Sequence, residues 1–377
     1  MGADSIIYIR TDGNSKIATG HFVRCLCIAE ALEALGKKIC FLVSDEESAA
    51  LLQDLTIALF KDCSFSFDVK VLKTAAYDNL ELELDELICL LDLGGDKGKR
   101  EYHDKCNEDI CHKPTIFTDS YFVTEKYLTS VSRFAQIAYM DDIRAFDYPV
   151  DLLINYDVIP FSKEVSYRES YKNAKKTLLG AQFTPLRKQF QNQKITVKKQ
   201  IQNILITSGG SDPYQFTNTL ITYFMEKKLK FQFHIVVGRL FSNVEELEKI
   251  ASKNSNIHLH CNVSDMAGLM KQCDFAVSAA GTTLYELCAL GIPAISFSMA
   301  DNQIPMAETF AEVGAVPYAG DIRVLETQQK EKILNCISEY LLFLHENANE
   351  YRKQQKNMNG LVDGNGAVKI AEELCKL

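Results

Sequence analysis

The amino-acid sequence predicts an α/β protein built from two doubly wound domains. Its 377 residues exceed what one ordinary hydrophobic core accommodates and suit two domains. Apolar, β-branched runs alternate with helical patterns along almost the whole chain, and this order produces parallel sheets covered by helices on both faces. A polar, basic stretch interrupts the alternation halfway. We therefore expect domains at 1–188 and 203–377, joined by a linker at 189–202.

Strand-length apolar runs recur in both halves of the chain and give each half a Rossmann-like pattern. In the first half we expect strands at 6–10, 38–43, 69–72, 115–118, 136–140 and 151–155. In the second half we expect strands at 203–207, 231–237, 257–260, 275–278 and 294–297. Helices fill the intervals and end with amphipathic patterns at 328–355 and 366–376. The sequence leaves open whether the last helix crosses back to the first domain.

The composition is that of a folded globular protein and excludes several function classes. Hydrophobic residues make up 47% of the chain and charged residues 24%. The formal net charge of −9 argues against a nucleic acid as partner, because phosphate backbones attract basic surfaces. No apolar run is long enough to cross a membrane, and the first residues show no secretory signal. We therefore expect a monomeric, cytoplasmic protein without a membrane partner.

The cysteines favour neither disulfides nor a metal site. Most of the 12 lie within apolar strand and helix patterns, as small hydrophobic residues do, so we expect reduced thiols. His103, Cys106, Cys111 and His112 lie near one another, but their spacing matches no zinc module. We expect no metal and no cofactor. The surrounding segment, 91–114, is unusually long and charged, and we expect it to form an added loop of the first domain.

The loop after the first strand contains the first candidate catalytic group. In open parallel sheets, ligands bind beyond the carboxyl ends of strands. The loop TDGNSKIATGH ends at His21, which begins a helix with apolar positions at Phe22 and Leu26. The helix dipole disfavours a protonated imidazole there, so His21 is expected to be neutral and able to act as a general base. A histidine that only caps its helix, beside a tight turn, is the alternative.

Two loops of the second half end at helix N-termini, where backbone amides bind anions. In SGGSDP, residues Gly209, Gly210 and Ser211 precede a helix, although the loop is neither a Walker motif nor a dinucleotide fingerprint. In SAAGTTLYELCALGIP, the residues Gly281 to Thr283 offer amides and hydroxyls at the start of another helix. Taken alone, the double-glycine loop is a weak signal.

Acidic and amide side chains near the second of these loops suit a nucleotide sugar. Glu286 lies one turn into the helix and could bind both hydroxyls of a ribose. Asn302 and Gln303 follow the next strand, and their amides suit sugar hydroxyls or acetamido groups. The alternatives are an acid that only stabilises the helix N-terminus and a turn that begins another helix.

Two acidic segments follow strands of the first half. In TDSY, Asp119 and Tyr121 lie at the sheet edge where His21 is expected, although an Asx turn with a packed ring explains them equally well. In YMDDI, Asp141 and Asp142 also follow a strand. Adjacent strand residues point to opposite faces, so we interpret this pair as structural.

With these motifs in view, the chain resembles the UDP-2,4-diacetamido-2,4,6-trideoxy-β-L-altropyranose hydrolases of pseudaminic acid biosynthesis. The resemblance spans nearly the whole length. The block AAGTTLYELCALGIP recurs in related glycosyltransferases, including the peptidoglycan N-acetylglucosaminyltransferase, and so indicates the GT-B fold more than the reaction. The resemblance rests on IRTDGNSKIATGHFVRC, TDSY, YMDDI, ITSGGSDP, the block from Asn262 to Phe297, ADNQ and LVDGNGAVKIAEEL.

The resemblance implies a GT-B enzyme whose substrate lies in the cleft between two domains. Such an enzyme uses water as acceptor and releases UDP and the free sugar with inversion, without a metal. It implies that His21 is the general base and that Tyr121 positions the water. Glu286 would hold the ribose and the loop at 281–283 the diphosphate, with Asn302 and Gln303 on the sugar. Two departures, Ala18 and Ser120, remove no proposed catalytic group.

Two other functions remain open. A UDP-sugar-dependent glycosyltransferase would share the nucleotide-binding block, and a non-catalytic nucleotide-sugar-binding protein would not need His21. Hydrolysis of a different UDP-diacetamido sugar is a further alternative. Beside the catalytic His21 and Tyr121, the expected substrate-binding residues are Arg10, Asp12, Gly20, Arg24, Gly209, Gly210, Ser211, Asp212, Val263, Gly281, Thr282, Thr283, Glu286, Asn302 and Gln303.

Overall fold

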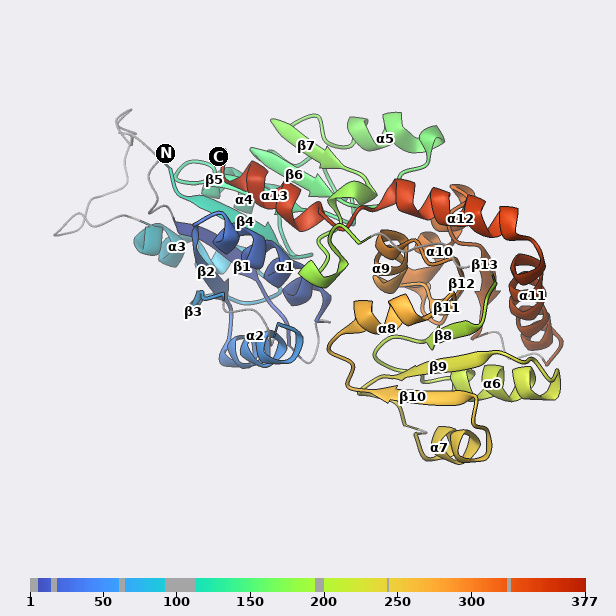
Figure 1. The fold of residues 1–377 in the computed structure, drawn as a ribbon. Coiled ribbons are helices and arrows are strands. Elements are labelled where there is room, and N and C mark those ends of the chain that lie inside the picture. The colour runs from blue at the N-terminus through green and yellow to red at the C-terminus, as the bar shows by residue number, and fades with distance from the viewer. Residues whose placement is uncertain are drawn as a thin grey trace. The chain divides into compact units, whose positions relative to one another are not determined.

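The chain folds into two compact units, each built around one parallel β-sheet (Figure 1). The computed structural model describes residues 6–14, 19–60, 65–91, 113–193, 200–242, 244–323 and 327–377. The first unit comprises Met1–Tyr156, Lys163–Pro185 and Ala367–Leu377, and the second comprises Asp157–Ser162 and Leu186–Gly366. The expected added loop at 91–114 and its histidines and cysteines lie almost wholly outside the described residues.

The first unit contains a seven-stranded sheet in the order β3-β2-β1-β4-β5-β6-β7. All of its strand pairs are parallel, and Ile9 in β1 pairs with Phe41 and Phe117 on its two sides. These apolar runs are strands because both faces of a parallel sheet are buried, which favours continuous hydrophobic sequence. The strands are β1 (Ile6–Thr11), β2 (Lys38–Val43), β3 (Asp68–Val71), β4 (Thr115–Asp119), β5 (Gln136–Met140), β6 (Leu152–Asn155) and β7 (Lys176–Leu179).

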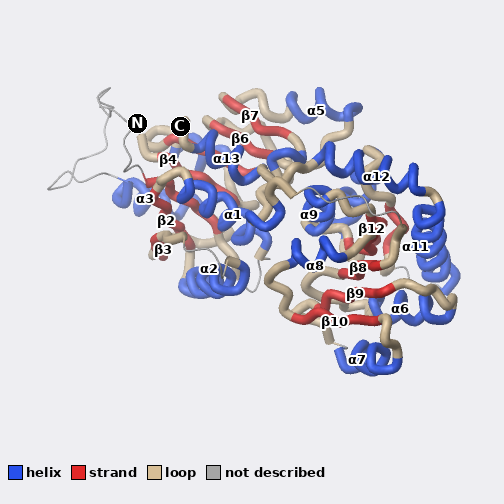
Figure 2. Tube along the Cα trace, in the orientation of Figure 1, coloured by secondary structure: helices blue, strands red, loops and turns tan. Residues whose placement is uncertain are grey.

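Helices cover this first sheet (Figure 2). The last helix of the chain is one of them: Ala367, Ile370, Ala371 and Leu374 are buried in the hydrophobic core of the first unit. The helices are α1 (Gly20–Ala34), α2 (Glu46–Leu59), α3 (Leu84–Leu91), α4 (Glu125–Val131), α5 (Glu164–Glu169) and α13 (Gly366–Leu374), with short 3-10 turns η1 (Leu80–Glu83), η2 (Phe161–Lys163) and η3 (Ala181–Phe183).

The second unit contains a six-stranded parallel sheet in the order β10-β9-β8-β11-β12-β13. Its strands are β8 (Asn203–Thr207), β9 (Gln232–Val237), β10 (Ile257–Cys261), β11 (Phe275–Ala279), β12 (Ala294–Ser298) and β13 (Tyr318–Asp321). The sequence patterns missed β7 and β13, which are edge strands. Neither strand is buried on both faces, and β13 includes Gly320 at a φ of 130°, so neither required a β-branched apolar run.

The helices of the second unit match the expected order, with one difference near its end. The single helix expected at 328–355 is two helices, α11 and α12. Asn347 separates them, because its side chain donates to the Phe343 carbonyl and its backbone (φ −119°, ψ 80°) leaves the helical region. The helices are α6 (Phe216–Glu226), α7 (Val244–Lys253), α8 (Met266–Gln272), α9 (Thr283–Leu290), α10 (Ile304–Glu312), α11 (Thr327–Glu346) and α12 (Ala348–Leu361), with η4 (Lys188–Phe190) and η5 (Asp301–Gln303).

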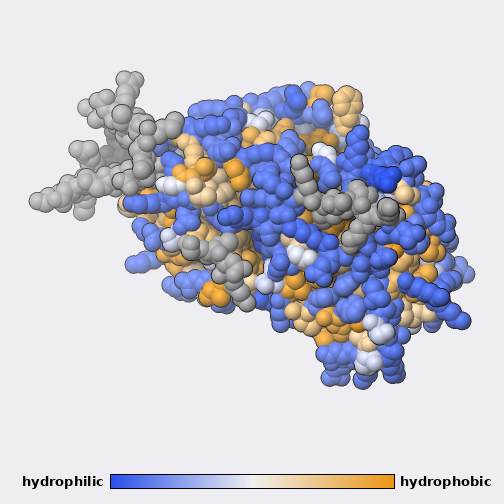
Figure 3. Space-filling view, viewed as in Figure 1, coloured by the Kyte–Doolittle hydropathy of each residue, from blue (hydrophilic) through white to orange (hydrophobic). Residues whose placement is uncertain are grey.

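Several large apolar side chains are exposed, among them Phe161, Val165 and Leu240. The face seen in Figure 3 is mostly hydrophilic, with hydrophobic residues scattered over it. Within the described residues, no helix is both long and apolar enough to span a bilayer.

Removing the apolar contacts of α13 should destabilise the first unit. Ile370 is fully buried in that core, so Ile370→Ala should lower the free energy of unfolding by about 2 to 5 kcal/mol. Urea denaturation followed by circular dichroism measures this loss. Glu372→Ala, on the exposed side of the same helix, is the matched control and should unfold like the wild type. Equal midpoints for the two variants would contradict the role of α13.

Candidate active site

Histidine 21 lies in the first turn of α1, close to the carboxyl end of the first sheet. Strands β1 and β4 are neighbours, and Thr11 at the end of β1 pairs with Asp119 at the end of β4. Helix α1 begins at Gly20 and places His21 and Arg24 one turn apart on the same face. Both side chains therefore reach the end of β4, where Asp119 is buried. The sequence placed Asp119 beside His21, and the structure brings the two together.

The His21 ring is oriented by Asp119. His21 Nδ1 lies 2.7 Å from Asp119 Oδ1, and the ring is 6% exposed. An ionised carboxylate only accepts hydrogen bonds, so Nδ1 must carry the proton that is shared with Asp119. Arg24 Nη2 also lies 2.9 Å from Nδ1, but it donates to Asp119 Oδ1, so we assign the Nδ1 proton from the shorter contact to Asp119. In this tautomer the lone pair of Nε2 is available to accept a proton.

Arg24 forms the centre of the buried charge network. Its Nε and Nη2 atoms donate to the two oxygens of Asp119 in a bidentate pair, and each donor–acceptor distance is 2.5 Å. Its Nη1 atom donates to Asp142 Oδ2 at 3.0 Å and to Tyr156 Oη at 2.8 Å. Burial alone would raise the pKa of Asp119, but the charge of Arg24 and the hydrogen bonds from His21 and Arg24 lower that pKa below its ordinary value. Asp119 is therefore a stable carboxylate under His21.

Tyr121 stands against the histidine ring. The two ring centroids are 4.5 Å apart at an interplanar angle of 76°, an edge-to-face contact. Tyr121 is 48% exposed, and its Oη donates to Asp142 Oδ2 at 3.2 Å. Burial of the ring and the Asp142 charge both raise the pKa of Tyr121, so its hydroxyl keeps its proton at neutral pH. The expected pair of His21 and Tyr121 is thus in contact.

The adjacent carboxylates Asp141 and Asp142 have different surroundings. Asp141 is buried, and it accepts hydrogen bonds from Tyr148 Oη, Tyr171 Oη and the loop amides that follow it. Its structural interpretation fits these contacts. Asp142 is turned toward Arg24 and Tyr121 instead. Both follow the last residue of β5, Met140, where strand alternation no longer fixes side-chain direction.

Two residues expected to bind substrate, Arg10 and Asp12, belong to a buried network of ion pairs at the sheet edge. Arg10 is fully buried. It donates through Nε to Glu83 and through Nη1 to Asp12, the latter at 2.6 Å. The other oxygen of Asp12 accepts from the Ser44 amide at 2.7 Å. These contacts fix the end of β1 from within the protein. Gly20, by contrast, is exposed at the start of α1.

The double-glycine loop of the second unit is held closely by its neighbours. Gly209 has a φ of 79°, a left-handed conformation that favours glycine. A Cβ atom on Gly238 would lie 2.4 Å from the Gly210 carbonyl oxygen, so Gly238 permits the loop to pass. Asp212 was expected to bind substrate, but its two oxygens accept from the Phe216 and Thr217 amides and cap α6. Ser211 is partly exposed beside it.

The strand-helix turn at 281–283 is open, as an anion site requires. A Cβ atom placed on Gly281 would meet no atom within 4 Å, and Thr282 is exposed at the N-cap of α9. One turn later, Glu286 Oε1 accepts from Arg187 Nη2 at 3.2 Å. Burial raises the pKa of Glu286, and the Arg187 charge opposes that change. Arg187 is a partner that no sequence pattern indicated, because it lies 99 residues away.

The remaining expected residues lie on loops of the second unit. Gln303 Oε1 accepts from the Met299 amide at 2.9 Å and so closes its own turn, whereas Asn302 is exposed beside it. Val263 is half-buried between β10 and α8. No cluster of potential metal ligands occurs among the described residues, and the histidines and cysteines at 103–112 are not among these.

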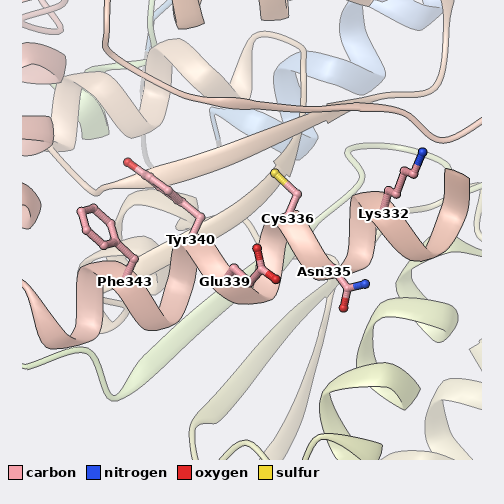
Figure 4. Close-up of a pocket in the computed structure, with 6 residues that line it drawn as sticks. All are labelled: Lys332, Asn335, Cys336, Glu339, Tyr340 and Phe343. Carbon is pink, nitrogen blue, oxygen red and sulfur yellow. The ribbon is translucent and has the colours of Figure 1, made fainter.

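An open hollow of about 510 Å³ runs along α11, and none of the expected site residues lines it (Figure 4). Tyr340 in this hollow donates to Gln354 of α12, and Asn335 accepts from Tyr223 of α6. These hydrogen bonds tie α11 to the helices beside it. The six residues that line the hollow are Lys332, Asn335, Cys336, Glu339, Tyr340 and Phe343, all on α11 itself.

Comparison with known proteins identifies relatives of both units. Residues 203–363 match the family model of the glycosyltransferase family 28 C-terminal domain. An uncharacterized protein of Methanocaldococcus jannaschii is 27% identical over 301 residues, which cover 77% of this chain and 54% of that protein. A Helicobacter pylori protein named pseudaminic acid cytidylyltransferase and UDP-2,4-diacetamido-2,4,6-trideoxy-beta-L-altropyranose hydrolase is 32% identical over 136 residues, 36% of this chain and 24% of that protein. The chain thus spans about half or less of the length of these relatives.

Solved structures establish the fold. The crystal structure of MurG from Acinetobacter baumannii superimposes with a TM-score of 0.64 and 13% identity, covering 99% of this chain and 100% of that one. At this identity the likeness concerns the fold alone. The two parallel-sheet α/β units have the GT-B fold of glycosyltransferases such as MurG, and the expected fold class is confirmed.

The buried Arg24–Asp119 pair makes a pH-dependent contribution to stability. Asp119→Asn leaves Arg24 without its counter-charge and should lower the free energy of unfolding by about 3 to 5 kcal/mol at pH 7. The pKa of Asp119 is lower in the folded protein than its ordinary 3.8, so the carboxylate stabilises the fold above that pH. Urea denaturation should show a constant difference from wild type between pH 7 and 5, narrowing below about 3.8. A difference that grows on acidification would contradict the assigned charge of Asp119.

Proposed function

We propose that the protein is an enzyme that acts on a UDP-sugar and transfers the sugar to water. The specific reaction proposed is hydrolysis of UDP-2,4-diacetamido-2,4,6-trideoxy-β-L-altropyranose to UDP and the free sugar, with inversion at the anomeric carbon. The observation that carries the proposal is the Asp119–His21 hydrogen bond, because a proton held on Nδ1 leaves Nε2 available as a general base. The partial match to the Helicobacter pylori protein supports the substrate.

The chemistry follows from these groups. His21 Nε2 removes a proton from a water molecule while the water oxygen bonds to the anomeric carbon. The bond between that carbon and the diphosphate oxygen breaks, and its electron pair leaves with UDP. Asp119 keeps the imidazole in the tautomer and orientation that this step needs, as a carboxylate does in hydrolytic triads. Tyr121 lies against the base, and its Oη accepts a hydrogen bond from the other O–H of the water.

The second unit supplies the groups for the UDP leaving group. The amides at 281–283 stabilise the charge that develops on the diphosphate, since a helix N-terminus favours anions. Glu286 accepts from the ribose hydroxyls, and its ion pair with Arg187 favours the carboxylate form. Asn302 and Gln303 contact the sugar. UDP is already a good leaving group. The amides at 281–283, Glu286 and the base are therefore sufficient for its departure.

A UDP-sugar-dependent glycosyltransferase is the second candidate. The match of residues 203–363 to a glycosyltransferase domain favours it. In this reaction His21 would deprotonate an acceptor hydroxyl rather than water, and the same residues of the second unit would bind UDP. The two reactions differ only in the nucleophile, so an experiment without an acceptor separates them.

Purified protein should convert the UDP-diacetamido-trideoxy-altrose without any added acceptor or metal. A proton and phosphorus NMR time course should show UDP and a free sugar, whose first-formed anomeric proton has the inverted configuration. Substrate that stays intact over hours, at enzyme concentrations that bind it, would refute the hydrolase. Turnover that then begins when acceptor sugars are added would establish the transferase.

Replacing the base should separate catalysis from nucleotide binding. His21→Asn keeps a side-chain N–H for Asp119 but removes Nε2, so turnover should fall by roughly 10²- to 10⁴-fold. The UDP dissociation constant from isothermal titration calorimetry should stay within about twofold of wild type, because UDP is bound by the second unit.

Glu286→Gln is the matched variant of the second unit and should give the reverse result. Losing the charge on a ribose acceptor should weaken UDP binding by roughly tenfold or more. A His21→Asn protein that retains most of the wild-type rate would rule out the proposed base.

A further inference from the structure

The loop between β5 and β6 holds one carboxylate firmly at the edge of the site. Asp141 anchors this loop from below, accepting the Ile143 and Arg144 amides and two buried tyrosine hydroxyls. Arg144 has a φ of 52°, a left-handed conformation that costs free energy for a residue with a side chain. A chain held in this way by several hydrogen bonds indicates a fixed position rather than a loose turn.

The residue that this loop presents is Asp142. Its Oδ2 atom accepts from Tyr121 Oη at 3.2 Å and from Arg24 Nη1 at 3.0 Å. The carboxylate is only partly buried, with 23% of its side chain exposed, and it joins the oriented base network to the exposed tyrosine. Of the two proposed catalytic side chains, His21 contacts the carboxylate of Asp119 in β4. Tyr121 contacts the carboxylate of Asp142 instead.

We propose that Asp142 is a positioning residue that acts through Tyr121, an inference that rests on the proposed function. A phenol has one hydrogen to donate, and the Tyr121 hydrogen is used on Asp142. The free lone pair of Oη can only accept a hydrogen bond. It therefore accepts one from the attacking water. That water then has its other hydrogen for His21 Nε2 and a lone pair for the anomeric carbon. Asp142 therefore decides which role the tyrosine hydroxyl plays.

This assignment separates Asp142 from its neighbour Asp119. Asp119 contacts the base directly and fixes its tautomer, whereas Asp142 touches neither the His21 ring nitrogen nor the reacting atoms in this arrangement. Removing Asp142 leaves the bidentate Arg24–Asp119 pair intact. The loss should consequently appear in the rate of the chemical step and not in nucleotide binding or folding.

A double-mutant cycle tests the coupling. Asp142→Ala should lower kcat by roughly tenfold with KM for the UDP-sugar within about twofold, because the water is misaligned while binding is unaffected. In Asp142→Ala/Tyr121→Phe, kcat should equal that of Tyr121→Phe alone, since Asp142 has nothing left to orient. Asp142→Asn retains an acceptor oxygen and should recover most of the rate. Asp147→Ala, on the same loop connection, is the control and should be as active as wild type.

A measurement without substrate keeps this inference separate from the proposed function. In protein labelled with [ζ-¹³C]tyrosine, the Tyr121 resonance is the one that disappears in Tyr121→Phe. That resonance should move in Asp142→Ala and stay near its wild-type position in Asp142→Asn. An unchanged resonance in Asp142→Ala, or rates that are additive in the double variant, would overturn the inference. Absence of turnover in the wild type, with a shifted resonance, would count against the proposed function alone.

Discussion

The buried pair between Arg24 and Asp119 is the interaction on which the candidate active site depends. A carboxylate that is 1% exposed is strongly disfavoured unless a counter-charge and hydrogen bonds replace its water. Arg24 supplies both through a bidentate contact, and Asp119 Oδ1 also accepts a hydrogen bond from His21 Nδ1. The orientation of the imidazole is thus a by-product of satisfying a buried charge. A lysine at position 24 would provide the charge but not the planar, two-point contact.

The same principle organises the rest of this sheet edge. Asp12 and Glu83 neutralise the buried Arg10 at the end of β1, and Asp141 is satisfied by two tyrosines and two amides after β5. Each network fixes one loop at the carboxyl edge of the sheet. Rigid loops matter because a general base is effective only when its nitrogen is held within hydrogen-bonding distance of the proton it removes. The exposed Tyr121 ring is then the group in this cluster with the most room to meet a ligand.

Sequence patterns predicted the central strands, which are apolar runs buried on both faces, and also the edge strands β3 and β10, in which apolar and polar residues alternate. They missed β7 and β13, which lie at sheet edges, and they merged α11 with α12, since one asparagine at position 347 sets the break. In the site, the neighbourhood of His21 and Asp119 followed from the topology of parallel strands. The internal partners of Arg10 and Arg24 did not, because Glu83, Asp119 and Asp142 are 73 or more residues distant along the chain. Local pattern carries no information about such pairs.

The position of α13 has a consequence for how the protein is made. Residues 367–377 complete the core of the first unit, yet the ribosome synthesises them only after the entire second unit. Until they emerge, the nascent first unit exposes the apolar surface that Ile370 and Leu374 will cover. All residues of the second unit have been synthesised by Gly366, so its core can be completed first. Chains released early would therefore have a complete second unit and a first unit with an exposed apolar surface, which makes them substrates for chaperones and proteases.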